Sequence, residues 1–190
     1  MHNHISGIVR HCKYHLNWIR KVRPYLTDDA TKTLVQCYVI SRIDYCNSLL
    51  ASLPKVHLQR LQKVINIAAR LIFQQPRDCS ITALLKALHW LKIEDRIAFK
   101  VLCLTWQSLN NKGPSYLSSL ITPHKPKRLL RSSHNSDLCV PKSRTSYGDR
   151  AFRHNAPMLW NTLPVMIRNQ PTLPLFKNKL KTHLFRKSYC

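Results

Sequence analysis

Apolar residues in the first 75 positions recur at the three- and four-residue spacing of amphipathic helices. One such run predicts a helix over residues 5–23, which Pro24 ends. Its apolar positions are Ile5, Ile8, Cys12, Leu16 and Ile19. Although this segment is basic like a mitochondrial transit peptide, it contains one serine and runs directly into core-like sequence, so we expect it to belong to the fold.

Two further helices are predicted before residue 75. The first should be capped by Thr27 or Asp28, whose side-chain oxygen can accept a first-turn N–H, and should end near residue 53, before Pro54. Its expected buried stripe is Leu34, Tyr38, Ser41, Tyr45 and Leu49. The second should span residues 55–73 with Arg60, Lys63 and Arg70 toward solvent. Its expected buried stripe is Leu58, Leu61, Ile65, Ala68 and Ile72.

The remaining pattern alternates short helices with turns. We expect helices over residues 81–88 and 93–109, the second being the most apolar, then a turn over 110–114 and at most a short helix over 116–121. Helical periodicity is lost over 122–150 and resumes over 150–161 and 175–185. Residues 129–130 and 138–140 could pair as a small hairpin. The fold class is therefore mainly α, with a basic irregular segment or a short β-hairpin.

The net charge gives the first indication of function. The 190 residues include 31 Lys and Arg against 8 Asp and Glu, which gives a net charge of +23. Residues 1–95 hold 14 basic and 6 acidic side chains, and residues 96–190 hold 17 and 2. So high a density of positive charge indicates a polyanionic partner, with nucleic acid considered first and a membrane surface second. A membrane-spanning helix is not expected, because Lys, Arg or Asp interrupts every stretch of eighteen residues.

Composition also limits the chemistry. Eight acidic residues leave little material for paired-carboxylate acid–base catalysis or an oxygen-ligated Mg²⁺ site, and the three glycines allow no phosphate-binding loop of the GxGxxG or GxxxxGK[ST] type. The seven cysteines are scattered, include no CxxC pair and follow no signal peptide, so we expect reduced thiols and an intracellular protein, cytoplasmic or nuclear, rather than a secreted one. We expect no cofactor and no small-molecule substrate.

Candidate catalytic and metal-binding residues are few, and each has a simpler interpretation. The pair Asp28–Asp29 follows an aromatic residue as in a polymerase palm, but the spacing differs, which favours helix capping. An N-terminal group could supply zinc ligands, but lacks a completing Cys/His pair, so surface histidines are favoured. This group is His2, His4, His11, Cys12 and His15. No residue pattern indicates a catalytic nucleophile.

Residues 125–153, which we call the basic arm, carry the strongest functional signal. Eight cations oppose Asp137 and Asp149 on a proline-interrupted backbone, as in segments that follow phosphates. The cations are Lys125, Lys127, Arg128, Arg131, Lys142, Arg144, Arg150 and Arg153. A solvated loop, or a nuclear-import patch at 125–128, is the alternative. A second basic set lies at helical spacing, and both a solvated face and phosphate contact remain open for it. This set is Lys55, Arg60, Lys63 and Arg70.

The four tryptophans could stack on unpaired bases, but all lie among apolar neighbours. We therefore expect Trp18, Trp106 and Trp160 in the core. Trp90 follows His89 at a helix break and is the expected exception.

Two adjacent runs, VISRIDYCNSLL at residues 39–50 and LQRLQKVINIAAR at 58–70, resemble the region after the palm in reverse transcriptases of non-LTR, jockey-like retrotransposons. Later runs resemble the C-terminal tail of that family, in the same order. They are LHWL at 88–91, PSYL at 114–117, YGDRAF at 147–152, APMLWNTLP at 156–164 and FKNKLKTHLF at 176–185.

The resemblance implies a nucleic-acid-binding fragment that is not an enzyme, because the family's metal-binding aspartates match no position here. Residues 1–75 would correspond to a helical thumb-like bundle, 76–121 to a helical core region and 122–190 to a basic tail. Expected partners are the RNA or DNA backbone and the polymerase part of the same element, with no membrane. The alternatives are a non-functional helical relic of a decayed mobile element and a protein-interaction module.

Overall fold

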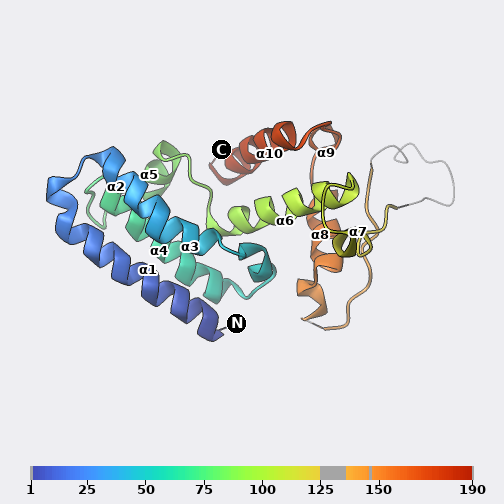
Figure 1. Cartoon of the computed structure of the whole chain (residues 1–190), viewed down its shortest axis with the longest axis horizontal. Helices are drawn as coiled ribbons and strands as arrows, with labels where there is room; N and C mark the ends of the chain where they lie inside the picture. Colours follow the sequence, from blue (N-terminus) through green and yellow to red (C-terminus); the bar gives the residue numbers. More distant parts are fainter. Residues whose placement is uncertain (1, 125–135, 146, 190) are drawn as a thin grey trace. The chain divides into compact units, whose positions relative to one another are not determined.

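The computed structural model describes residues 2–124, 136–145 and 147–189, which are mostly helical (Figure 1) and form no β-strand. This confirms the mainly α prediction. The long helices are α1 His2–Val22, α4 Lys55–Ile72, α6 Ile93–Leu109, α8 Phe152–Asn161 and α10 Leu173–Tyr189. Shorter helices are α2 Asp28–Val35, α3 Ser41–Asp44, α5 Ile81–Ala87, α7 Ser115–Ser118 and α9 Val165–Arg168. A π-helical segment, Gln36–Ile40, and 3₁₀ turns at Arg23–Tyr25, Asn47–Leu50 and Gly148–Arg150 complete the order.

Two compact units share the chain. Unit 1 comprises Met1–Asn47, Leu53–Arg96 and Lys187–Cys190, and unit 2 comprises Ser48–Ser52 and Ile97–Arg186. These limits fall within α6 and α10, and they differ from the limits near residues 75 and 121 that the sequence suggested.

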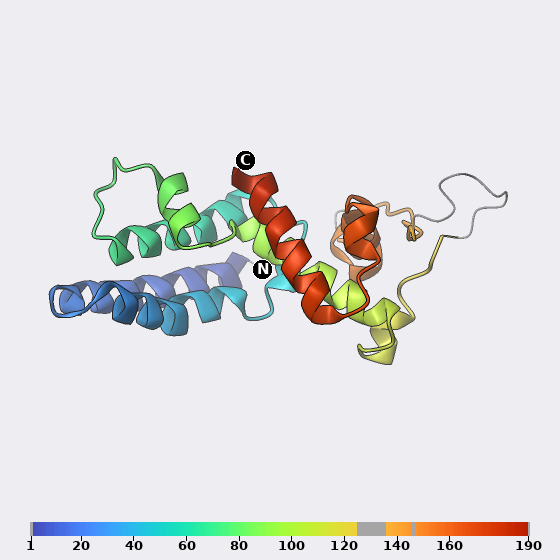
Figure 2. The same cartoon turned by 90° about the horizontal axis from the view of Figure 1, so that it is seen from above.

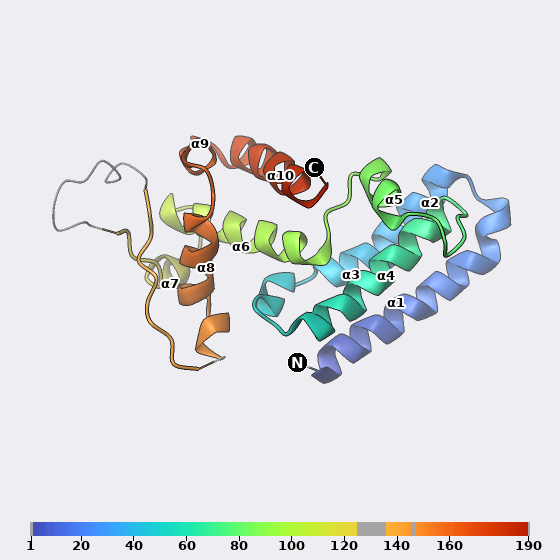
Figure 3. The same cartoon turned by 180° about the vertical axis from the view of Figure 1, so that it is seen from behind.

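Unit 1 is built around the pair α1 and α4, which lie side by side and run in the same direction (Figures 1 and 3). The chain then reverses through the turn after α1, so that α2 and α3 run back along it (Figure 2). The predicted buried stripe of α4 is confirmed at all five positions. In α1, Ile5, Cys12, Leu16 and Ile19 are buried as predicted, while Ile8 is half-buried.

The predicted helix over residues 28–53 is wrong beyond its first half. Thr27 does cap α2, where its Oγ1 accepts the Ala30 N–H at 3.2 Å, but the chain passes through a π-helical segment and leaves the helical path after Asp44. The predicted stripe is also wrong, because Tyr38, Ser41, Tyr45 and Leu49 are exposed and Leu34 is half-buried. The buried positions are Thr31, Val35, Val39, Ile40, Ile43, Asn47 and Leu50.

An aromatic stack lies at the centre of unit 2. The Phe176 ring of α10 lies between Trp106 of α6, 6.0 Å away between centroids, and Trp160 of α8, 5.9 Å away. Each indole N–H also has an acceptor, since Trp106 donates to the Gln170 carbonyl and Trp160 to that of Ser136. Large rings with satisfied donors are effective core residues, and here they join three helices.

The predicted pairing of 138–140 with 129–130 stays a prediction. Residues 129–130 lie outside the described residues, and Leu138 instead forms an antiparallel bridge with Pro123. The Cys139 N–H donates to Thr122 and the His124 N–H to Asp137, both at 2.9 Å. The Asn161 side chain satisfies both the N–H and the carbonyl of Leu138.

Among the described residues, six that are not glycine adopt a left-handed backbone with φ between 50° and 56°. They are Cys46, Ser52, Gln74, His89, Asn111 and Ser136. Gln74 follows α4, and the Gln75 N–H donates to the Arg70 carbonyl at 3.0 Å, as in a Schellman end. Such positions favour glycine, so these turns keep a side chain against a conformational cost.

Across the described ranges, no helix combines the length and the apolar character needed to cross a membrane.

Buried thiols provide a test of the fold. Burial raises the pKa of Cys12 and of Cys103 to about 11 each, whereas Cys37, Cys46 and Cys139 are exposed. At pH 8 iodoacetamide should modify the exposed thiols of the native protein and spare Cys12 and Cys103, because a neutral buried thiol is a poor nucleophile. Mass spectrometry of tryptic peptides reads the result, and urea-unfolded protein is the control in which all of these thiols react.

The same shifts set a pH dependence of stability. The folded-state pKa lies above the ordinary 9.0, so the stabilisation is complete below pH 9 and is lost as the pH rises through 11. The urea concentration at the unfolding midpoint should therefore decrease as the pH is raised from 9 to 11. A Cys12→Ala/Cys103→Ala variant, which has neither thiol, should lose less over that interval, and an equal loss would contradict the burial of these groups.

Candidate nucleic-acid interface

Four of the eight cations of the predicted basic arm are not among the residues that the structure describes. Lys125, Lys127, Arg128 and Arg131 lie outside the described residues. The segments on either side of them are fixed to each other, through the Pro123–Leu138 bridge, and to α9, where buried Arg168 pairs with Asp137. That ion pair also removes one of the two carboxylates that oppose the positive charge of the arm.

The described half of the arm is not gathered into one site. Lys142 and Arg144 are exposed on an irregular segment, and Arg153 is exposed in the first turn of α8. Arg150 is half-buried with its guanidinium carbon 5.2 Å from the Tyr147 ring centre. Asp149 lies 3.9 Å from the His154 imidazole, an ion pair only when that ring is protonated. Three exposed cations of the arm thus remain available to an anion.

The second basic set divides between solvent and α1. Lys55 and Lys63 are exposed, whereas Arg60 and Arg70 are half-buried, so the expectation of a solvent-facing side chain is met at Lys63 and only in part at Arg60 and Arg70. Arg60 donates to the Ser6 hydroxyl of α1 at 3.1 Å. Arg70 lies in the last turn of α4 and faces a cavity that α1 also lines.

A groove of about 650 Å³ runs between α1 and the end of α4, and we call it the α1–α4 groove. Its cationic residues are Lys13, Arg20, Arg23, Arg70 and Arg77. Its neutral polar residues are Asn17, Gln74 and Gln75, and Leu16, Ile67, Leu71 and Pro24 supply the apolar surface. None of the described residues that line it is an aspartate or a glutamate. A concave surface with one sign of charge focuses the electrostatic field and attracts anions.

The helical repeat places these side chains together. Lys13, Asn17 and Arg20 follow one another at four and three residues, so they share one side of α1, beside its buried stripe. Ile67 and Arg70, three residues apart on α4, and Gln74, just after that helix, line the other side. Because α1 and α4 are parallel neighbours, Lys13 and Arg20 of α1 and Arg70 of α4, which are distant in sequence, border one groove.

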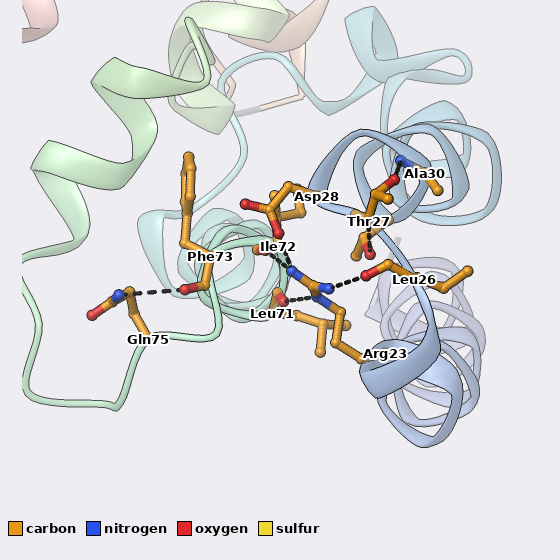
Figure 4. A network of polar contacts seen from close by, with 10 residues as sticks. Arg23, Leu26, Thr27, Asp28, Ala30, Leu71, Ile72, Phe73 and Gln75 are labelled. Atoms are coloured by element: carbon orange, nitrogen blue, oxygen red, sulfur yellow. Dashed lines mark hydrogen bonds and ion pairs between the residues drawn. The ribbon is translucent and has the colours of Figure 1, made fainter.

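Arg23, which also lines the groove, is the centre of a network of polar contacts (Figure 4). Its side chain is buried and donates to the carbonyls of Leu71, at 3.2 Å, and Ile72, at 2.7 Å, and to that of Leu26 at 2.6 Å. It also forms an ion pair with Asp28. The last carbonyls of a helix have no partner within it, and a guanidinium satisfies them well.

The charge of Arg23 is thus compensated, but the other groove cations are not. Within the described part of the chain, Lys13, Arg20, Arg70 and Arg77 form no ion pair with any carboxylate. The Arg70 Nε is also buried without a hydrogen-bond partner among the described residues. Four uncompensated positive charges around one cavity are a suitable environment for phosphate groups.

Tryptophan burial differs from the sequence prediction. Trp90, the expected exception, is only 6% exposed, while Trp18, expected in the core, is 58% exposed. Tyr14, one turn earlier on α1, is 62% exposed. Apolar neighbours in sequence did not reveal this, because Leu16 and Ile19 lie on the opposite side of the same helix.

The N-terminal histidines do not gather into a metal site. Over the residues that the structure describes, no three His, Cys, Asp or Glu side chains lie close enough to share a metal ion. His15 instead stacks on Tyr38, with ring centres 5.2 Å apart. Partial burial, with the nearby charges of Arg42 and His11, lowers the pKa of His15 below its ordinary value.

Comparison with models of known protein families, with curated proteins and with solved structures finds no match to this chain. The chemistry of the groove therefore rests on its own residues.

Substitutions of Arg23 and of its ion-pair partner Asp28 should lower the free energy of unfolding by unequal amounts. Arg23→Met keeps the aliphatic volume but leaves the α4 carbonyls unsatisfied, and should lower the free energy of unfolding by about 3 kcal/mol. Asp28→Asn removes a charge from a side chain that is 67% exposed, and should cost about 1 kcal/mol or less. Urea unfolding followed by circular dichroism measures both. Equal losses would mean that the ion pair, rather than the carbonyl bonds, holds the turn.

Proposed function

We propose that this protein binds the sugar–phosphate backbone of nucleic acid, with the α1–α4 groove as a principal contact. The observation that carries the proposal is the set of four groove cations, Lys13, Arg20, Arg70 and Arg77, which no described carboxylate neutralises. Side chains of this kind contact phosphates without reading sequence, so the affinity should depend weakly on sequence and strongly on salt.

The basic arm is the proposed second contact. It contains eight cations and two carboxylates, and one of these, Asp137, is neutralised by Arg168. Two separate basic regions are consistent with a net charge of +23, which exceeds what one groove provides. We propose that both follow the phosphates of RNA or DNA.

At the level of biological role, we propose that the chain is a nucleic-acid-binding C-terminal fragment of a retrotransposon polymerase, without a catalytic palm and without enzymatic activity. This rests on the ordered motifs alone. The polymerase part of the same element is its proposed protein partner, and an intracellular location is supported by the free cysteines of the described residues.

Removing three groove cations should weaken binding and flatten its salt dependence. For Lys13→Gln/Arg20→Gln/Arg77→Gln, the slope of log K against log salt should fall by about 2 to 3, since each phosphate contact contributes about 0.7 to 0.9. Fluorescence anisotropy of labelled oligonucleotides at several salt concentrations measures the slope.

The matched control is Lys32→Gln/Lys86→Gln/Lys100→Gln, which makes the same change in net charge at exposed positions outside the groove. Its slope should stay within about 1 of the wild type, because only contacted phosphates release counterions. If the two triple variants behave alike, the groove is not the contact. Equal binding of polyglutamate and nucleic acid by the wild type would contradict a dedicated nucleic-acid function.

The arm has its own test. Arg128→Gln/Arg131→Gln/Arg144→Gln should also lower the salt slope by about 2 to 3, and combination with the groove variant should lower it further by about the same amount, since the two regions contact different phosphates. The same anisotropy titrations apply. An unchanged slope would show that the arm is a solvated loop.

A further inference from the structure

We infer that a second cavity, which lies between α1 and α3 and which we call the α1–α3 pocket, binds a nucleoside monophosphate, with the phosphate on Arg42 and the base over Gly7 and Ile8. Its volume of about 570 Å³ lies within the range of about 300 to 1,000 Å³ that small-ligand sites have. The pocket lies within unit 1 and shares no lining residue with the α1–α4 groove, so this site goes beyond the proposed function and does not depend on it.

Gly7 is the first observation that points to a ligand. It lies inside the 21-residue helix α1, although glycine is the weakest helix former after proline. A glycine at such a position is usually explained by a backbone or a ligand that comes close to the helix. A Cβ at residue 7 would meet no heavy atom within 4 Å beyond its own stretch of helix, so no described part of the protein packs against it. Because Gly7 lines the pocket, we attribute the glycine to a ligand.

The π-helical segment Gln36–Ile40 provides the opposite wall of the pocket. Such turns are rare and occur frequently at functional sites, because the extra residue changes the direction of the side chains that follow. Here the segment buries its last two residues in succession. The next turn then leaves Ser41, Arg42 and Tyr45 exposed, and all three line the pocket. The departure from α-helical geometry therefore brings a polar face to the side of α1.

Arg42 gives the pocket a positive charge that no described carboxylate neutralises. None of the described residues that line the pocket is acidic. Partial burial, followed by the charges of Arg42 and His11, lowers the pKa of the neighbouring His15, so Arg42 of α3 and His11 of α1 both act on one imidazole. Arg42 and His11 also both line the pocket. A guanidinium with its planar set of N–H donors is well suited to hold a phosphate.

The uncharged groups of the pocket suit a nucleoside. The Ser41 hydroxyl donates to the Cys37 carbonyl, so its oxygen is left to accept a hydrogen bond from a ribose hydroxyl or from an amino group of the base. Gly7 and Ile8 form a floor with only one side chain, on which a flat ring can lie, and Tyr45 supplies an aromatic ring at the side. Donors for a phosphate and an apolar surface for a ring thus occur in one cavity.

The first test is isothermal titration calorimetry of the wild type with adenosine monophosphate, adenosine and inorganic phosphate. The monophosphate should bind about tenfold more tightly than either part alone, because only it contacts both Arg42 and the floor. Arg42→Gln should weaken binding of the monophosphate about tenfold and leave that of adenosine unchanged. The matched control is Arg10→Gln, which removes the same charge at an exposed position of α1 that lines neither cavity, and it should have no effect.

The second test changes stability and binding in opposite directions. In Gly7→Leu the new Cβ enters open space and leucine favours the helix, so the melting temperature should rise by about 4 °C. The same side chain covers the floor of the pocket, so binding of adenosine monophosphate should be lost. Thermal melting followed by circular dichroism and the same calorimetry give the two readouts. A variant that is more stable and still binds the monophosphate would contradict the site.

The outcomes separate this pocket from the α1–α4 groove. Lys13→Gln/Arg20→Gln/Arg77→Gln should bind adenosine monophosphate as the wild type does. If this variant loses the monophosphate, if Arg42→Gln keeps it, or if the wild type does not bind it, the inference is overturned, and the anisotropy titrations still decide the groove function. Displacement of the monophosphate by a 5′-phosphorylated oligonucleotide, but not by the same strand with a 5′-hydroxyl, would make a strand end the source of the nucleotide. If neither strand displaces it, the ligand is the free nucleotide.

Discussion

One buried guanidinium determines how unit 1 is assembled. Arg23 directly follows α1 and donates to two terminal carbonyls of α4, so the turn after α1 and the end of α4 are fixed to each other by a charged group that replaces the missing helical partners. Because Arg23 also pairs with Asp28 at the start of α2, three helices meet at one side chain. The α1–α4 groove is the space left beside this junction, and its cationic sides exist only while the two helices keep that registration.

The helices that the sequence predicted well are those with one unambiguous apolar stripe. For α4, the residues Leu58, Leu61 and Ile65 have no competing arrangement, and its bounds are within one residue of those expected. Residues 28–50 offer two stripes one position apart, and the tyrosines made the wrong one attractive. The π-helical turn, which buries both Val39 and Ile40, cannot be recognised from a period of 3.6.

The sequence indicated which residue types form the candidate site, but not which residues lie next to one another in it. The excess of Lys and Arg indicated a polyanion, and Arg70 was among the residues named for it. Its neighbours Lys13 and Arg20 lie more than 45 positions away in sequence, and only the parallel packing of α1 on α4 brings them to the same groove. Helix phase likewise decides which tryptophan is exposed, since Trp18 and Trp90 both have apolar sequence neighbours and only Trp18 points away from the core.

The left-handed residues have an evolutionary consequence. At φ near 50° an L-residue costs about 1 kcal/mol that glycine does not, yet in the described part of the chain every position with such a φ holds a residue other than glycine. Gln74 is one of them, and it lines the groove with its amide. The five other left-handed residues carry the same conformational cost. Substitution of any of them by glycine would remove that cost and could offset a destabilising substitution elsewhere. The chain can therefore vary its binding surfaces without first acquiring a better core.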